Sequence, residues 1–218
     1  MGSDQKRKAI FGVVLAALAA VALFSITRVG DSTPPAFHLG FDGSEKLDLV
    51  TLAPDRYRVD HGVLQIQGLM NRPLWVNYKL PRDVRVRVKA RSLSPEGDVK
   101  VELFGDGRSG YQGDPRLAYT ATGYILVMGG WSNTISAIAR QHEHGHDRAE
   151  RNDVRVEPGK WYQWSIERRG SKISWAVDGQ PFLEFDDPQP LYDEQHQYFG
   201  FGDWTTPVEF DDLSIEPL

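Results

Sequence analysis

Period-two alternation of apolar and polar residues is the feature that most limits what this chain can fold into. Between residues 84 and 91, Val or Ala occupies every even position and Arg or Lys every odd one. An extended strand with this pattern has one apolar and one polar face, whereas a helix would have no apolar stripe. The alternation recurs at Val99–Leu103 and Tyr162–Ile166. It predicts half-buried antiparallel strands.

Turn signals separate the apolar segments and define hairpins. Arg168-Arg169-Gly170-Ser171 leads into a strand at 173–177, and Asp178-Gly179 is a strong two-residue turn before the strand that contains Phe182 and Phe185. Other expected strands lie at 37–41, 57–59, 63–66, 74–80, 124–128, 154–156, 198–202 and 208–216. Short strands at this spacing, without an internal repeat, predict an all-β, two-sheet antiparallel jelly-roll sandwich.

Charge and cysteine content exclude several classes of function. The 218 residues include 25 Lys and Arg against 30 Asp and Glu, so the formal charge of −5 argues against general nucleic-acid binding. The absence of Cys excludes disulfides, thiolate metal ligands, cysteine nucleophiles and a lipidated cysteine anchor. The apolar core alone must therefore stabilise the domain.

The N-terminus indicates export. Residues 1–8 form a basic leader, and residues 9–26 are uncharged and apolar, a run that at about 1.5 Å per residue spans roughly 27 Å of hydrocarbon. The basic residues before this run place the leader in the cytoplasm and the rest outside. A cleaved signal peptide is the alternative, with Ala20 and Ala22 as an A-x-A site. Residues 27–36 are a linker to a domain at 37–218, on the periplasmic or extracellular side.

The order of four segments resembles the concanavalin A-like lectin and glucanase superfamily. The segments are FHLGFDG at 37–43, DHGVLQIQG at 60–68, the hairpin at 158–187 and FGFGDWTTPVEFDDLSIEPL at 199–218. They are most similar to the laminin-G-like and 3-keto-disaccharide hydrolase-type branches. The resemblance implies a jelly-roll sandwich over residues 37–218. It does not specify the function, since lectins, glycosidases, lyases and adhesion modules share this sandwich.

A sugar-binding inventory is concentrated between Gly123 and Arg148. Aromatic rings stack on the apolar faces of sugars, and Asn, Arg, Glu and His bind hydroxyl groups directionally. The candidate ligand-binding residues are Tyr124, Trp131, Asn133, Arg140, Glu143, His144 and, from a neighbouring loop, Trp204. Each aromatic candidate has a structural alternative, since Trp131 and Trp204 could equally pack at a sandwich edge or in the core.

The segment His142–His146 satisfies the H-E-x-x-H pattern of zinc metalloproteases through His142, Glu143 and His146. That pattern requires a helix, and Gly145 inside it argues for a polar loop between strands. A metal-binding or ligand-binding loop without protease chemistry is a third alternative.

Catalytic patterns of this superfamily are largely missing. No E-x-D-x-x-E strand motif occurs, which excludes laminarinase-type chemistry. The 3-keto-disaccharide resemblance leaves Glu143, His144 or Glu102 as acid or base groups. Asp42 and Asp211 are candidate Ca²⁺ ligands between the first and last strands. The sequence thus favours a membrane-anchored, non-catalytic module that binds a glycan or polyol. A glycoside-processing hydrolase and a protein-binding envelope module are the alternatives.

Overall fold

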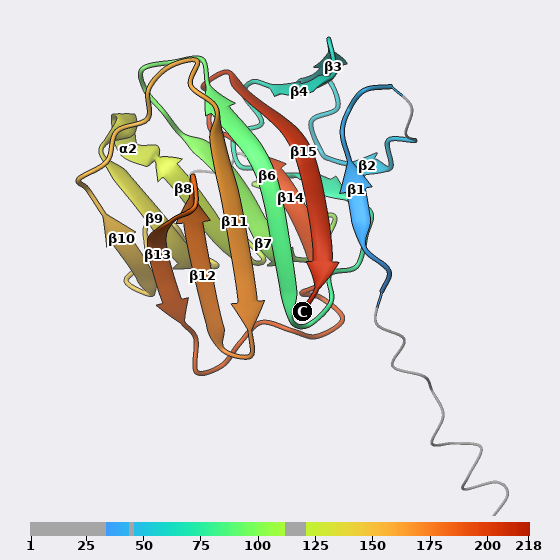
Figure 1. The fold of residues 1–218 in the computed structure, drawn as a ribbon, viewed down its shortest axis with the longest axis vertical. Helices are drawn as coiled ribbons and strands as arrows, with labels where there is room; N and C mark the ends of the chain where they lie inside the picture. Colours follow the sequence, from blue (N-terminus) through green and yellow to red (C-terminus); the bar gives the residue numbers. More distant parts are fainter. Residues whose placement is uncertain (1–33, 44–45, 112–120) are drawn as a thin grey trace, which may run out of the picture. The chain divides into compact units, whose positions relative to one another are not determined.

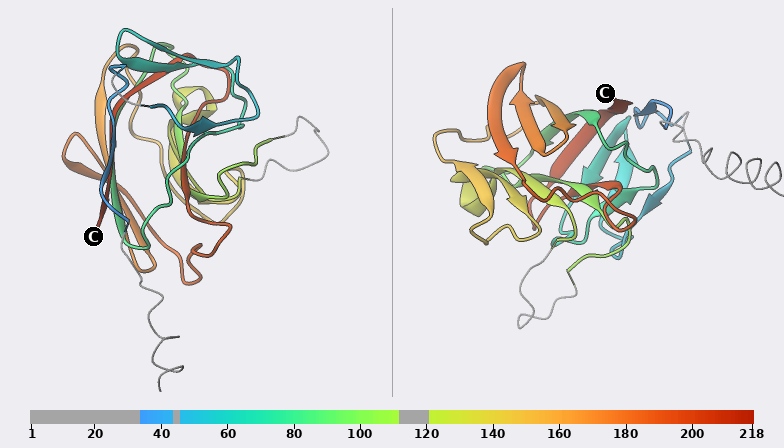
Figure 2. Two further views of the ribbon diagram at one scale, coloured as in Figure 1. Left: turned by 90° about the vertical axis from the view of Figure 1, so that its right-hand side faces the viewer. Right: turned by 90° about the horizontal axis from the view of Figure 1, so that it is seen from below.

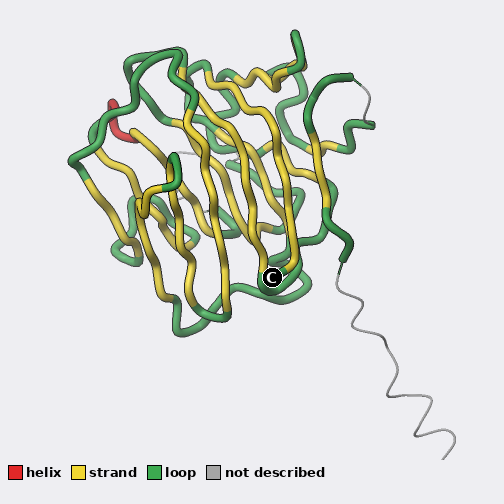
Figure 3. Tube along the Cα trace, in the orientation of Figure 1, coloured by secondary structure: helices red, strands yellow, loops and turns green. Residues whose placement is uncertain are grey.

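Two antiparallel β-sheets face each other in the domain (Figures 1 and 2). The structure is a computed structural model that describes residues 34–43, 46–111 and 121–218. The described residues outside the strands form turns and loops, apart from the four-residue segment α2 (Gly130–Asn133), as Figure 3 shows. The predicted all-β, two-sheet sandwich is confirmed.

The first sheet, sheet A, contains eight of the described strands. Its order is β13-β12-β11-β6-β15-β4-β3, and β1 also pairs with β15. The strands are β1 (Phe37–Leu39), β3 (Tyr57–Asp60), β4 (Val63–Ile66), β6 (Val84–Ser92), β11 (Tyr162–Arg169), β12 (Lys172–Val177), β13 (Gln180–Asp186) and β15 (Val208–Pro217). Both predicted hairpins are present, because β11 pairs with β12 and β12 with β13.

The second sheet, sheet B, contains seven described strands and carries the candidate site. Its order is β10-β9-β8-β7-β14-β5-β2. The strands are β2 (Leu49–Val50), β5 (Leu74–Val76), β7 (Val99–Gly105), β8 (Tyr124–Gly129), β9 (Ile135–Arg140), β10 (Arg148–Arg151) and β14 (Tyr198–Gly202). In Figure 1 this sheet lies behind sheet A.

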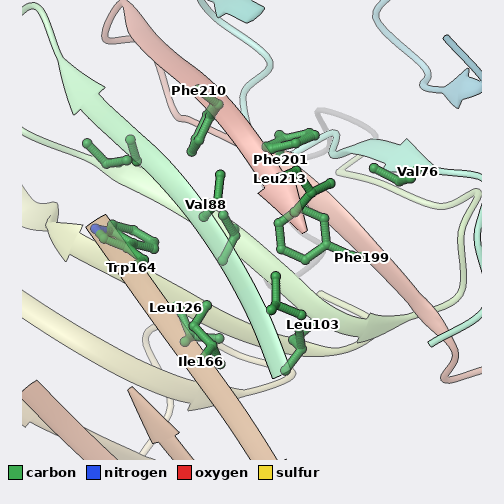
Figure 4. Close-up of a cluster of buried hydrophobic side chains, with 14 of the residues drawn as sticks. Val76, Val88, Leu103, Leu126, Trp164, Ile166, Phe199, Phe201, Phe210 and Leu213 are labelled. Carbon is green, nitrogen blue, oxygen red and sulfur yellow. The ribbon is translucent and has the colours of Figure 1, made fainter. Parts of the chain in front are cut away.

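The apolar core fills the space between the sheets (Figure 4). Alternate residues of each strand point into it, as the period-two pattern predicts. From sheet A, Val88, Trp164 and Phe210 meet Leu126 and Phe199 from sheet B. Full burial of such a side chain contributes about 1.5–3 kcal/mol relative to exposure. This core supplies the stability that the chain cannot take from disulfides.

The outer face of sheet B is also buried over its central strands. Val99, Val101 and Leu103 of β7 point into the core, so Lys100 and Glu102 point outward, yet both are buried. Loops that cross this face cover them. The site described below lies under these loops.

Two local predictions are wrong. Val154–Val156 forms no strand, because the Val156 N–H donates to the Asn133 side chain instead of to a neighbouring strand. The edge strand is β10, whose polar residues Arg148–Arg151 pair with β9. It has no alternation of apolar residues, and so no sequence signal indicates it.

The predicted leader and apolar run, with most of the linker, lie within residues 1–33, outside the described residues. No helix in the described ranges is long and apolar enough to cross a bilayer. An anchor or signal segment at 9–26 therefore stays a prediction.

Candidate functional site

A pocket of about 600 Å³ lies on the outer side of sheet B, where β7 begins and β8 ends. It contains four of the seven predicted ligand-binding residues: Trp131, Glu143, His144 and Trp204. Other lining residues were not expected from the sequence. They include Asn71, Glu96, Asp98, Lys100 and Tyr111.

Lys100 is the centre of the pocket floor. Its Nζ lies 2.9 Å from Glu143 Oε2 and 3.6 Å from Asp98 Oδ1, and it donates a 2.9 Å hydrogen bond to Asn71 Oδ1. Only about 5% of the Lys100 side chain is exposed. One buried ammonium therefore joins three separate loops at the floor.

A second carboxylate ties the loops from behind. Asp203 accepts hydrogen bonds from the Gly68 and Leu69 N–H groups at 2.6 and 2.8 Å, which fixes the loop that carries Asn71. Asp98 uses its other oxygen, Oδ2, to accept a 2.6 Å hydrogen bond from the Trp204 N–H. The floor thus positions Trp204 through its backbone.

Burial sets the protonation behaviour of this cluster. It raises the pKa of Asp203 to about 6, and it raises the pKa of Asp98 as well, despite the nearby ammonium. Burial by itself disfavours the Lys100 ammonium, but the charges of Asp98 and Glu143 outweigh this effect and raise the pKa of Lys100. Lys100 is therefore a fixed cation between carboxylates at neutral pH.

Trp131 forms one wall of the pocket and sits in an unusual backbone turn. Trp131, Ser132 and Asn133 all have positive φ angles, 51°, 56° and 61°. A left-handed turn of non-glycine residues costs roughly 1–2 kcal/mol per residue. The Thr134 N–H closes the turn with a 2.9 Å hydrogen bond to Gly130 O. Backbone strain of this kind is concentrated at functional sites.

Asn133 holds that turn in place. Its Nδ2 donates to Pro95 O at 3.0 Å and to Val156 O at 2.8 Å, and its Oδ1 accepts from the Val156 N–H at 2.8 Å. The amide therefore replaces the hydrogen bonds of a strand partner. Asn133 is buried and positions Trp131 without itself lining the pocket.

The Trp131 ring is oriented by two neighbours. The His144 ring packs edge-on at a centroid distance of 5.4 Å, and the Arg148 guanidinium lies 5.1 Å from the indole centroid. Arg148 also donates a 2.6 Å hydrogen bond to Glu143 O. The loop of residues 141–147 is thereby fixed beside Trp131.

That loop settles the H-E-x-x-H alternatives in part. Residues 141–147 form turns and bends between β9 and β10, so His142 and His146 do not share a helical face. The metalloprotease alternative is therefore wrong, and the polar-loop interpretation is confirmed. Within the described ranges, no group of three or more His, Cys, Asp or Glu side chains is placed to hold a metal.

Trp204 forms the opposite wall together with Tyr111. Their ring centroids are 6.2 Å apart, and about 40% of Trp204 is exposed. The Tyr111 N–H donates to Asn71 O at 2.8 Å, which connects this wall to the floor. The pocket thus has aromatic side chains on two sides and polar groups below.

Tyr124 and Arg140 lie away from the pocket. They are paired across β8 and β9, on the side of sheet B that faces the core. The Tyr124 hydroxyl and Arg140 Nε both donate to Asp187 Oδ2, at 2.7 and 2.9 Å. Burial, reinforced by this hydrogen bond, raises the pKa of Tyr124. Both residues therefore hold the segment after β13, and neither is near the glycan candidates.

Glu102 lies on the outer face of β7 next to Lys100 but does not line the pocket. Its Oε1 accepts hydrogen bonds from the Thr122 and Gly123 N–H groups at 2.9 and 2.6 Å, and from Thr122 Oγ1 at 3.1 Å. Burial raises its pKa to about 7. Of the three predicted acid or base groups, only Glu143 and His144 reach the pocket.

The calcium hypothesis is only partly addressed by the fold. β1 and β15 are paired, so the first and last strands do meet, with Leu39 opposite Leu213. Asp42 is exposed and Asp211 is partly buried beside Lys89. Calcium binding by Asp42 and Asp211 stays a prediction.

Comparisons with known proteins agree on the fold. A family model described as Farnesoic acid 0-methyl transferase matches residues 113–211, which is part of the sandwich only. No curated protein matches the chain significantly. A carbohydrate-binding module of Bacillus subtilis matches at a TM-score of 0.51, with 12% identity over 70% of this chain and 86% of that one.

Two further solved structures match over more of the chain. A prokaryotic β-1,3-1,4-glucanase (lichenase) derived from a mouse hindgut metagenome has a TM-score of 0.60 and 11% identity, with 85% of this chain and 100% of that one covered. A Bacillus subtilis protein with a galectin-like fold gives 0.59 and 12%, with 85% and 97% covered. The chain has the concanavalin A-like jelly-roll fold, as the sequence resemblance predicted.

Proposed function

We propose that this concanavalin A-like domain binds a glycan, without catalysis, in the pocket between Trp131 and Trp204. The observation that carries the proposal is the combination of two indole walls with a buried polar floor in one open pocket. A pyranose ring has apolar faces that stack on indoles and hydroxyl groups that need directional partners. The solved structures of this fold include a carbohydrate-binding module, which supports the choice of ligand class.

The pocket is suited to binding because its parts are fixed before a ligand arrives. Asn133 holds the Trp131 turn, and Asp98 holds the Trp204 backbone. Both are tied to the buried Lys100 cluster or to the strands beside it. Little side-chain freedom is then lost on binding, which favours affinity.

A glycan-array screen of the full chain, run with and without calcium, tests the proposal. Trp131→Ala and Trp204→Ala should each lower the affinity for a hit at least tenfold, which corresponds to about 1.4 kcal/mol. Trp161→Ala is the matched control, because Trp161 stacks against Arg91 on sheet A, outside the pocket. Equal affinity in all four proteins, with the fold intact, would overturn the stacking role.

A glycoside-processing hydrolase is the second candidate, and one observation favours it. Asp98 and Glu143 both lie within ion-pair distance of the same ammonium and both line the pocket. Two nearby carboxyl groups are what an acid and a nucleophile or base require. Product analysis on any array hit, with Glu143→Gln compared with the wild type, separates the two: cleavage that Glu143→Gln abolishes would establish the enzyme, and an intact glycan the binding module.

The location and calcium dependence belong to the same proposal. Residues 9–26 would anchor the chain in a membrane, or would be cleaved, with the sandwich outside the cytoplasm. Mass spectrometry of the N-terminus distinguishes the two, because cleavage near Ala22 would give a shortened chain. Loss of binding on chelation, restored by Ca²⁺ and absent in Asp211→Asn, would support the metal at Asp42 and Asp211.

A further inference from the structure

We infer that the pocket selects glycans that carry a free ammonium group, as amino sugars do. The inference rests on the proposed glycan binding and names the class of sugar that the pocket would take. It follows from the charges that line the pocket and from how each of them is already paired.

Acidic side chains outnumber basic ones around the pocket. Glu96, Asp98 and Glu143 line it, whereas Lys100 is the one Lys or Arg among its described lining residues. Asp203 adds a further carboxyl group directly behind the floor. A ligand in this pocket therefore meets a negative potential, which favours a cation and disfavours a uronate or sialate.

The basic groups close to the pocket are already engaged by carboxylates. The Lys100 ammonium is held between Glu143 and Asp98. Arg148, which stacks over Trp131, lies 2.6 Å from Glu150 Oε2. Neither cation is positioned to attract an anionic sugar.

Glu96 is the carboxylate left for a ligand. It is exposed at the pocket rim and makes no ion pair within the described residues. The aromatic walls reinforce its effect, because the faces of Trp131, Trp204 and Tyr111 attract cations. An ammonium on a sugar ring could contact an indole face and Glu96 together.

Calorimetric titration of the full chain at pH 7.5 tests the inference with four probes. These are the tetramers of glucosamine, N-acetylglucosamine and galacturonic acid, and choline as a cation without a sugar. The glucosamine tetramer should bind at least tenfold more tightly than the N-acetylated one, and the galacturonate tetramer least tightly. Raising NaCl from 50 to 300 mM should reduce the preference, because the attraction is electrostatic.

Two variants assign that preference to the pocket. Glu96→Gln should reduce the preference for glucosamine three- to fivefold, while Glu194→Gln should leave it unchanged. Glu194 is an exposed carboxylate outside the pocket, so it reproduces the change in net charge alone. Glucosamine binding that survives in Trp131→Ala would show nonspecific attraction to an acidic protein and would overturn the inference.

The outcomes separate this inference from the proposed function. Equal or tighter binding of the N-acetylated tetramer would overturn the charge selection and leave glycan binding intact. Choline binding without any binding of the tetramers would contradict glycan binding and support selection for an ammonium. Binding of none of the four would contradict both.

Discussion

Glu102→Gln provides a direct test of how the buried outer face of sheet B affects stability. Glu102 is almost fully buried on β7, and its Oε1 accepts three hydrogen bonds from Thr122 and Gly123. A glutamine keeps the oxygen that accepts these bonds and cannot ionise. The substitution therefore removes the titration while it preserves the contacts.

The sign and size follow from the pKa. Burial raises the pKa of Glu102 from 4.5 to about 7. Between these values the native state keeps a proton that the unfolded state has lost, so stability falls as the pH rises. One pKa unit corresponds to about 1.4 kcal/mol, and from pH 5.5 to 8.5 the wild type should lose about 2 kcal/mol through this group. Below pH 4.5 the stabilising effect of the bound proton is fully present.

Urea denaturation of both proteins at half-unit steps from pH 5.5 to 8.5 measures this effect. The free energy of unfolding of Glu102→Gln should rise relative to the wild type by about 2 kcal/mol across the range. The difference between the two proteins removes contributions that they share, such as Asp203, whose pKa is also raised, to about 6. A difference that stays constant within about 0.5 kcal/mol, well below the effect expected from linkage, would refute the argument that Glu102 is desolvated.

Three substitutions test the other structural roles. Lys100→Met should destabilise the domain by about 3–5 kcal/mol at pH 7.5, and less at pH 5, because it strands buried carboxylates that protonate as the pH falls; urea denaturation at both pH values measures this. Asn133→Ala should cost about 2–3 kcal/mol and also weaken glycan binding, because three buried backbone hydrogen bonds are lost; denaturation and calorimetry report the two effects. Arg168→Met should leave the melting temperature unchanged or raise it. Arg168 is buried against Phe104, and neither of its terminal nitrogens has a hydrogen-bond partner within the described residues. A fall of several degrees would contradict that account.

The fold was largely predictable because alternation determines which face of a strand is buried. Val84–Ser92 and the β11–β12–β13 hairpins lie where the pattern and the turn residues indicate. The polar edge strand Arg148–Arg151 has no apolar face to mark it. Its pairing depends on β9, which only the folded chain brings beside it.

The candidate site was partly predictable because Trp131, Glu143 and His144 lie close together in the sequence and remain together in the fold. Tyr124 could have been excluded from the sequence. It has the same parity as Leu126 and Met128 on β8, and these point into the core, whereas Val127 points into the pocket. Parity along a strand thus separates the face of the pocket from the face of the core.

Lys100 could not have been found in this way, and the reason shows how the site is built. Alternation on β7 places it opposite Val99 and Val101, which in an ordinary sandwich is the solvent face. The loops that carry Asn71 and Glu143 cover that face and desolvate the ammonium. An isolated buried cation is unfavourable, so the same loops must supply its carboxylates. The charge that orders the floor of the pocket therefore also requires the acidic surroundings from which we infer a preference for ammonium-bearing ligands.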